Sequence, residues 1–185
     1  MSGNRVNATA SSLLGFLHEG PMTGWDLVAT AQRRIGDFWT LTQSQVYREL
    51  AQMAERGLVK AGERGPRARQ PYELTDAGRA AFREWVNREP GPETIRFPLL
   101  LMLAFGRHLE PDRLAEFVSR HRSMHAELLA GYEGQRLDPE PGAPAADPFA
   151  IATLEFGIVY ERAVLEWFDR LPASIAGEAT SRRSG

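Results

Sequence analysis

The chain has 185 residues, and 43% of them are hydrophobic, which is enough for a folded core and excludes an intrinsically disordered protein. It contains no cysteine, which excludes disulfides and thiolate metal sites. The longest strongly apolar run, residues 97–105, is far shorter than the roughly 18 residues of a membrane span. No basic segment followed by an apolar one opens the chain, so we expect no signal peptide and a soluble, cytoplasmic protein.

The net charge of −2 is unevenly distributed. Residues 1–90 hold 12 basic and 10 acidic side chains, whereas residues 91–185 hold 10 basic and 14 acidic ones. Residues 43–70 contain six basic and three acidic side chains. Because charges act over a Debye length of about 8–10 Å, this local excess is what a phosphate backbone would feel. The excess is modest and does not identify a partner by itself.

Two breaker clusters divide the chain. Residues 89–92 (EPGP) mark a boundary, and the Pro/Ala-rich residues 138–148 would interrupt any helix. The sequence therefore predicts an N-terminal domain at residues 8–89 and a C-terminal domain at residues 93–171.

Apolar residues at helical spacing predict three helices at the start of the first domain. We expect them at about residues 8–19, between the N-cap Thr23 and Gly36, and from Thr42 or Gln43 to Gly57. In the third helix the spacing predicts a buried stripe formed by Val46, Leu50 and Met53.

The periodicity then changes to that of a β-hairpin. Residues 58–62 and 70–74 read as two short strands, and residues 63–69 form a turn-rich basic tip between them. Thr75 is expected to cap a helix that ends near Asn87. The order helix, helix, helix, hairpin, helix predicts a winged helix-turn-helix within a mainly α fold class.

The third helix and the hairpin tip form a candidate DNA interface. Glutamine can bond an adenine edge, arginine a guanine edge or a phosphate, and clustered arginines favour a phosphate backbone or a minor groove. Taken alone, each feature could also be a solvated helix face or a solubilising loop. The residues expected to contact double-stranded DNA are Gln43, Ser44, Gln45, Tyr47, Arg48 and Gln52 on the helix, and Arg64, Arg67 and Arg69 on the tip.

Three segments carry a family resemblance. Residues 13–27 (LLGFLHEGPMTGWDL) resemble the opening of the PadR family of bacterial transcriptional regulators. Residues 44–50 (SQVYREL), followed by ERGLV, resemble its recognition helix, and YELTDAG at residues 72–78 resembles its junction after the wing. Many members have Gly and Pro at the positions of Ser44 and Arg48, and this departure resembles the virulence-activator-like branch. The resemblance covers residues 11–88 and implies a dimeric regulator that usually represses transcription.

The second domain has more apolar surface than it can bury alone. Residues 95–105 are apolar nearly all round, and such a helix must be covered on most sides, with Pro98 in its first turn. A helix at about residues 111–135 has one apolar stripe, whereas a last helix at about residues 148–171 has two. We therefore expect a homodimer, and the family's C-terminal helical dimerisation region agrees with this over residues 94–171. The expected dimerisation residues are Leu154, Ile158 and Leu165 on one stripe, and Phe156, Tyr160, Val164 and Trp167 on the other.

Tryptophans suggest an effector pocket. Aromatic side chains at a dimer seam can line a site for a planar apolar molecule, although ordinary core packing also explains them. PadR-like regulators often respond to phenolic or drug-like molecules, which the resemblance implies here. Trp39, which precedes the third helix, and Trp167 are the candidate pocket residues.

Other chemistries have weaker support. His121 and His125 are four residues apart, but no acidic residue completes a metal set, and we predict no metal and no cofactor. No catalytic arrangement and no phosphate-binding loop is present, so the chain is not predicted to be an enzyme. The remaining alternative is a winged-helix module that binds another protein without specific DNA recognition.

Overall fold

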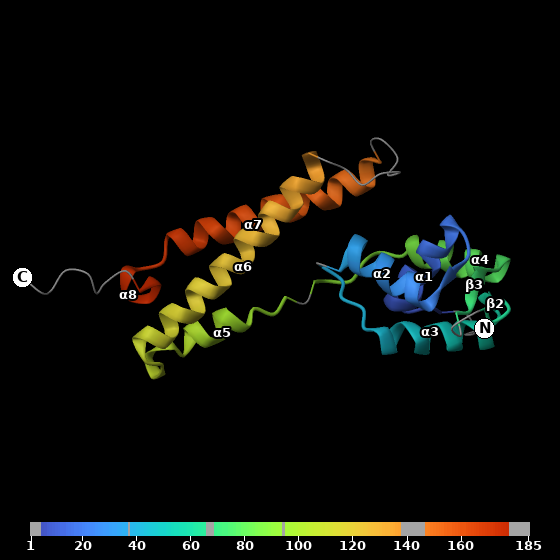
Figure 1. Ribbon diagram of the computed structural model, residues 1–185, viewed down its shortest axis with the longest axis horizontal. Coiled ribbons are helices and arrows are strands. Elements are labelled where there is room, and N and C mark those ends of the chain that lie inside the picture. The colour runs from blue at the N-terminus through green and yellow to red at the C-terminus, as the bar shows by residue number, and fades with distance from the viewer. Residues whose placement is uncertain (1–4, 37, 66–68, 94, 138–146, 178–185) are drawn as a thin grey trace, which may run out of the picture. The chain divides into compact units, whose positions relative to one another are not determined.

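The computed structural model describes residues 5–36, 38–65, 69–93, 95–137 and 147–177 (Figure 1). The chain forms two compact units, residues 1–92 and residues 93–185. In the first unit the described helices are α1 (Ala8–Phe16), α2 (Gly24–Ile35), α3 (Gln43–Glu55), α4 (Asp76–Val86) and the 3-10 turn η1 (Leu17–Glu19), and the strands are β1 (Met22–Thr23), β2 (Val59–Ala61) and β3 (Pro71–Leu74).

Helix α1 lies at the centre of the first unit, where it packs against α2, α3 and α4. Figure 1 shows α3 on one side of α1 and α4 on the other. The predicted stripe of Val46, Leu50 and Met53 on α3 is confirmed, because all three side chains are completely buried. They share the core with the aliphatic residues Leu13, Leu14, Leu17, Leu27 and Leu58.

Helices α2 and α4 begin after the predicted caps Thr23 and Thr75, and α3 begins after Thr42, one of the two starts expected for it. Thr23 and Thr42 each form a capping box, in which the threonine oxygen accepts from the third backbone N–H of the helix and that residue's side chain accepts from the threonine N–H. Thr75 caps α4 through a hydrogen bond from the Gly78 N–H, 3.1 Å long. After α3, Gly57 adopts a left-handed φ of 70°, which glycine reaches without a steric penalty.

A three-stranded antiparallel sheet has the order β1-β3-β2. Strands β2 and β3 form the predicted hairpin, with Val59 opposite Leu74. The sequence does not predict β1, whose two residues are too few to show an alternating pattern. Met22 in β1 pairs with Tyr72 in β3, so the start of α2 is tied directly to the hairpin.

The regular elements among the described residues of the second unit are all helices. Its elements are α5 (Pro98–Ala104), the 3-10 turn η3 (Gly106–His108), α6 (Pro111–Leu137), α7 (Pro148–Asp169) and α8 (Ala173–Ala176). The core contains Leu99, Leu114, Val118 and Phe168. Ile175 of α8 packs against this core, so the folded part of the unit extends beyond the expected end at residue 171.

Helices α6 and α7 form a hairpin with charged residues along its exposed seam. The ion pairs across this seam are Arg122–Asp169, Glu133–Arg162 and Arg136–Glu155. Inside the hairpin, His125 Nδ1 lies 2.5 Å from Glu161 Oε2, and the Glu161 side chain is only 5% exposed. Among the described residues, no helix combines the length and apolar character that crossing a membrane requires.

Candidate nucleic-acid interface

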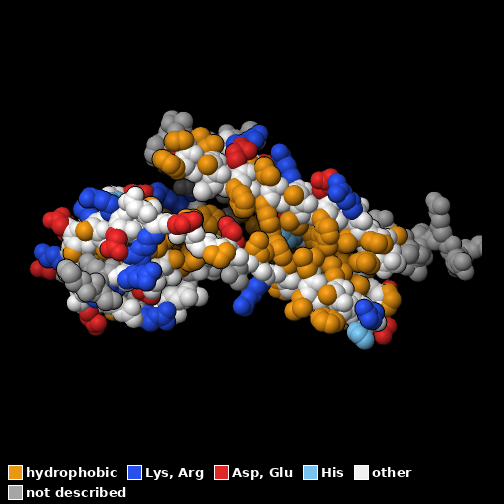
Figure 2. Space-filling view, turned by 180° about the vertical axis from the view of Figure 1, so that it is seen from behind, with side chains coloured by type: hydrophobic (Ala, Val, Ile, Leu, Met, Phe, Trp, Pro, Cys, Tyr) orange, Lys and Arg blue, Asp and Glu red, His pale blue; other side chains and the backbone are white. Residues whose placement is uncertain are grey.

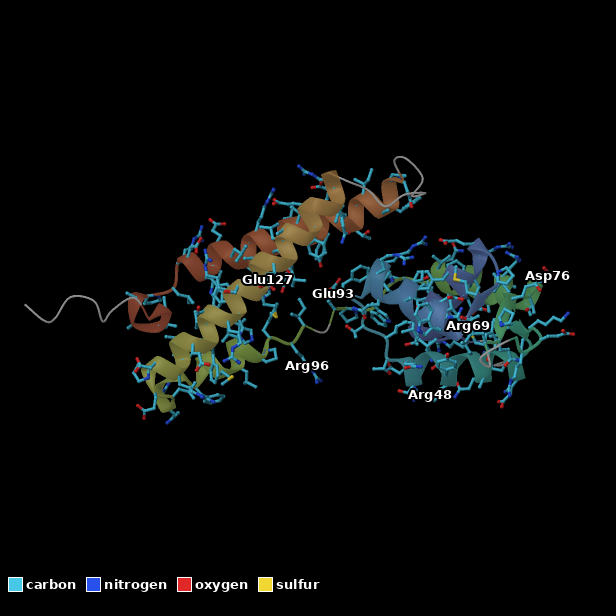
Figure 3. The ribbon with its side chains drawn as sticks, in the orientation of Figure 1. Arg48, Arg69, Asp76, Glu93, Arg96 and Glu127 are labelled. Atoms are coloured by element: carbon cyan, nitrogen blue, oxygen red, sulfur yellow. The ribbon has the colours of Figure 1, made fainter. Side chains whose placement is uncertain are left out.

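The outward face of α3 is polar and exposed. This face lies opposite the buried stripe of α3, since a helix that packs on one side leaves the other side to solvent. Figure 3 shows Arg48 on the outer side of this helix. The face therefore presents amide, hydroxyl and guanidinium groups, which is the chemistry that bonds base edges and phosphates. The exposed residues among those expected to contact DNA are Gln43, Ser44, Tyr47, Arg48 and Gln52.

Gln45 is bonded differently from the other residues of this face. It is half-buried, and its Oε1 accepts hydrogen bonds from the Thr42 backbone N–H at 2.9 Å and the Thr42 hydroxyl at 3.0 Å. Its side-chain oxygen is thus engaged in capping α3, and only the amide N–H groups remain for a DNA contact. Helical spacing shows that Gln45 points outward but cannot show this bond.

The ring of Tyr47 lies against the backbone of Gly24 at the start of α2. A Cβ atom on Gly24 would stand 2.6 Å from Tyr47 Cε1 and 2.8 Å from Tyr47 Cζ, closer than atoms can approach. The ring therefore rests where only glycine leaves room, and Tyr47 remains 43% exposed. This contact joins the two helices of the helix-turn-helix beside the reading face.

Glu49 is a buried residue of α3 that the sequence analysis misses. Asn7 Nδ2 donates a 3.1 Å hydrogen bond to Glu49 Oε1. The Asn7 side chain also caps α1, because Asn7 Oδ1 accepts from the Ala10 N–H at 2.8 Å. One asparagine therefore caps α1 and holds α3, and this link could be suspected only from the cap signal at Asn7.

The described part of the hairpin tip exposes Arg64 and Arg69, while Arg67 lies outside the described residues. The Gly65 N–H donates to the Arg69 carbonyl at 2.8 Å and closes the loop. The guanidinium carbon of Arg69 lies 5.7 Å from the centre of the Trp25 ring. Arg69 therefore contacts α2 as well as belonging to the hairpin.

Asp26, the neighbour of Trp25, has a lowered pKa. Hydrogen bonds from the Thr23 hydroxyl and then the Thr23 N–H are the main causes, since both favour the charged carboxylate. Burial opposes the lowering of the pKa, and the positive charge of Arg69 adds to it. The start of α2 thus carries a negative charge that is held in place by its own cap.

The apolar residues expected at a dimer seam differ in how far each is buried within the second unit. Ile158 is completely buried inside the second unit, so we correct its expected role: no part of its side chain remains to contact a partner. Val164 and Trp167 pack against the core, whereas Phe156 is 68% exposed. The half-buried members of the set are Leu154, Tyr160 and Leu165.

A large apolar surface nevertheless remains exposed on the second unit. Of α5, which the sequence expects to be covered on most sides, only Leu99 is buried. Figure 2 shows hydrophobic side chains gathered over this unit. The exposed large apolar residues of α5, its C-cap and α7 include Leu100, Leu101, Phe105, Phe156 and Val159.

The two candidate pocket tryptophans lie in different units. Trp39 is exposed just before α3, and Trp167 is in α7. A hollow of about 220 Å³ lies at the hairpin, and neither tryptophan lines it. Its lining residues are Pro21, Lys60, Gly62, Pro71, Tyr72 and Glu73.

The histidines of α6 are engaged in contacts within the second unit. His121 Nδ1 lies 2.9 Å from the Phe117 carbonyl oxygen, and His125 is paired with Glu161. Within the part of the chain that the structure describes, no three His, Asp or Glu residues gather as metal ligands would.

Two family models match consecutive parts of the chain. The model of the transcriptional regulator PadR-like family matches residues 13–84, and the model described as virulence activator alpha C-term matches residues 95–175. The negative transcriptional regulator PadR of Bacillus subtilis is 24% identical over 173 residues, which cover 89% of this chain and 95% of that protein.

Solved structures share the fold. Bacillus subtilis PadR in complex with operator DNA superposes with a TM-score of 0.73 at 22% identity, over 88% of this chain and 96% of that one. The same protein in complex with p-coumaric acid gives a TM-score of 0.68, also at 22% identity, over 88% of this chain and 95% of that one. The Vibrio cholerae virulence activator AphA gives 0.69 at 24% identity, over 92% and 97% of the two chains.

Proposed function

The chain belongs to the PadR-like family of transcriptional regulators, in its virulence-activator-like branch, and we propose that it represses transcription by binding operator DNA as a homodimer. It is a regulator and not an enzyme. The observation that carries DNA binding is the exposed polar face of α3 in the same compact unit as the hairpin arginines. The complex of Bacillus subtilis PadR with operator DNA supports this function, and the name of that relative as a negative regulator supports repression.

In this proposal the helix and the hairpin have different tasks. Arg48 and the exposed glutamines of α3 bond base edges in the major groove, and Ser44 and Tyr47 bond base edges or phosphate oxygens. The hairpin arginines Arg64, Arg67 and Arg69 hold the phosphate backbone without reading the sequence. Because the DNA that it is proposed to bind is genomic, we propose that the protein is cytoplasmic.

The homodimer is proposed from the exposed apolar surface of the second unit. Phe156 and Val159 on α7 and Leu101 on α5 are each more than half exposed, and hydrophobic side chains gather over this unit in Figure 2. A second copy of the chain would cover them. A two-fold dimer would also present two copies of the α3 face to an operator with two related half-sites.

We further propose that a small aromatic or hydrophobic effector releases the regulator from DNA. The complex of Bacillus subtilis PadR with p-coumaric acid supports this class of ligand. Trp39 and Trp167 are the proposed reporters of binding. Titration of p-coumaric acid and related phenols should quench tryptophan fluorescence and weaken the DNA complex, whereas unchanged fluorescence and affinity across the panel would contradict the effector proposal.

The DNA-binding proposal is tested by fluorescence anisotropy with a labelled duplex from upstream of the protein's own gene. We expect salt-dependent binding that an unrelated duplex competes with poorly. Arg48→Ala should weaken specific binding by about 1–3 kcal/mol. Arg79→Ala is the matched control, since Arg79 is an exposed arginine of the same unit on α4, across α1 from α3.

The alternative, a winged-helix module that binds another protein, predicts a different result. In that case the wild-type protein would show only weak, non-specific binding to both duplexes, as expected for a protein with a net negative charge. Equal binding to the operator and the unrelated duplex would contradict sequence-specific recognition by α3.

A further inference from the structure

Trp25 is an exposed aromatic residue at the start of α2 with no part in the described apolar core. It is the second residue of that helix, and it is 58% exposed. A tryptophan in such a place has a large apolar ring that burial does not explain. The ring instead contacts a cation from the hairpin, since the guanidinium carbon of Arg69 lies over one face of the ring, 5.7 Å from its centre.

The backbone around Arg69 holds this contact in place. The Arg69 carbonyl accepts from the Gly65 N–H, and the Gly62 carbonyl accepts from Gln70 Nε2 at 3.1 Å. On the other side, β1 ties the residues before Trp25 to β3 through the pairing of Thr23 with Pro71. Both partners of the contact thus belong to, or lie next to, hydrogen-bonded backbone.

The stacking contact leaves the N–H donors of Arg69 available, while the charge of Arg69 also acts on the neighbouring Asp26 carboxylate. A guanidinium stacked on an aromatic face uses its flat surface, and its five N–H donors lie in the guanidinium plane. These donors can still form the paired hydrogen bonds that a phosphate accepts. A free arginine side chain would have to lose much of its rotamer freedom when it binds, whereas a stacked one has lost part of it already.

From this geometry we propose that Trp25 is a positioning residue for DNA binding: its ring holds Arg69 of the hairpin tip so that the guanidinium meets a backbone phosphate while α3 occupies the groove. This inference rests on the proposed DNA-binding function. Helix α2 would then contribute to DNA binding together with α3 and the hairpin, although its sequence does not predict such a role. Figure 3 shows Arg69 within the unit that carries Arg48.

A double-mutant cycle on the full-length protein tests the proposal, with operator affinity measured over a series of salt concentrations. Trp25→Leu should lower the affinity roughly two- to fivefold, as expected for an exposed cation–π contact. It should also make the dependence of log affinity on log salt less steep, although it removes no charge. Arg69→Ala should reduce that slope by about one, because one phosphate contact is lost.

The decisive result is the coupling between the two residues. In the Trp25→Leu background, Arg69→Ala should cost less affinity than it costs in the wild type. Trp25→Phe keeps a ring face and should restore most of the affinity and the slope. Arg79→Ala is the control for loss of an arginine, and the thermal midpoints of all variants should match the wild type, since the substituted side chains are exposed.

Failure of this inference differs from failure of the proposed function. If the wild type binds its operator and the effects of Trp25→Leu and Arg69→Ala simply add, the positioning role is overturned and DNA binding stands. If Trp25→Leu does not fold, the Trp25→Phe and Arg69→Lys variants decide. Arg69→Lys keeps the charge but loses the flat stacking surface, so an affinity equal to wild type would also overturn the role of Trp25. If the wild type binds no DNA, the proposed function itself is wrong.

Discussion

Single residues at the start of α2 determine how the reading face is built. Gly24 provides the space in which the Tyr47 ring rests, with the nearest ring carbon 2.6 Å from where a Cβ would stand. The close contact with Tyr47 is therefore the reason for a glycine here, and it links a residue without a side chain to the proposed DNA interface.

Gly24→Ala is expected to weaken operator binding by about tenfold, because the new methyl group must displace the Tyr47 ring from the edge of the reading face. Operator affinity measured by anisotropy checks this. Gly131→Ala, on α6 where an added Cβ would meet nothing within 4 Å, is the control and should leave the affinity unchanged. Unaltered operator affinity in Gly24→Ala would show that the position of Tyr47 does not matter for binding.

Ser11 offers a prediction about stability. Its Oγ is buried and has no hydrogen-bond partner among the described residues, whereas the neighbouring Ser12 Oγ donates to the Thr9 carbonyl at 2.8 Å. A buried unsatisfied polar group costs about 1–3 kcal/mol. Ser11→Ala should therefore raise the free energy of unfolding by about 1 kcal/mol in urea titrations, while Ser12→Ala should give no such gain. A destabilised Ser11→Ala variant would mean that the hydroxyl is bonded after all.

At the scale of elements, the caps of α2 and α3 differ in one property. Both are capping boxes built on threonine, but the partner of Thr23 is the ionisable Asp26 and the partner of Thr42 is the neutral Gln45. Hydrogen bonds from Thr23 lower the pKa of Asp26 in the folded protein. The stabilisation that this carboxylate provides is therefore complete above its ordinary pKa and is lost as the pH falls through the lower folded value.

Thr23→Ala is expected to lower the free energy of unfolding at neutral pH by about 0.5–2 kcal/mol, because the cap is lost. The difference from wild type should narrow as the pH falls through the folded pKa of Asp26, when the wild type also loses its charged partner. Urea unfolding at a series of pH values measures this. Thr42→Ala should show a deficit that does not change over the same range, and parallel curves for the two variants would contradict the role of the Asp26 charge.

The elements that could be predicted are those whose signals are local in the sequence. Thr42 and Gln45 are three positions apart, and Val46, Leu50 and Met53 repeat along one helix, so caps and buried stripes can be found without a fold. Strand β1 exists only because β3 lies beside it. The contacts of Tyr47 with Gly24 and of Arg69 with Trp25 likewise depend on how distant segments pack. The spacing of these residues in the sequence therefore does not reveal the contacts.

At the scale of the whole molecule, the proposed dimer depends on apolar surface that the second unit does not bury. Val159→Asp should weaken self-association on the order of 100-fold, because a charge would have to be buried without a partner. Analytical ultracentrifugation over a range of concentrations measures the change. The control is the same substitution at Val86 of the first unit, which is 56% exposed compared with 62% for Val159.

The two outcomes separate the surfaces of the two units. Val86→Asp should sediment as the wild type does, and Val159→Asp as a monomer that keeps its helical circular dichroism. A wild type that remains monomeric at all concentrations would overturn the homodimer. A Val159→Asp variant that still dimerises would place the contact elsewhere on the unit.

The charges along the hairpin of α6 and α7 have a consequence for the register of these two helices. Exposed ion pairs add little stability, but these alternate in sign: Arg122 on α6 meets Asp169, and Glu133 on α6 meets Arg162. Sliding α7 by one turn, about four residues, would bring Glu133 opposite Glu166 or Ile158. The pattern of charges therefore favours the observed register of α7 on α6 over one that is shifted by a turn.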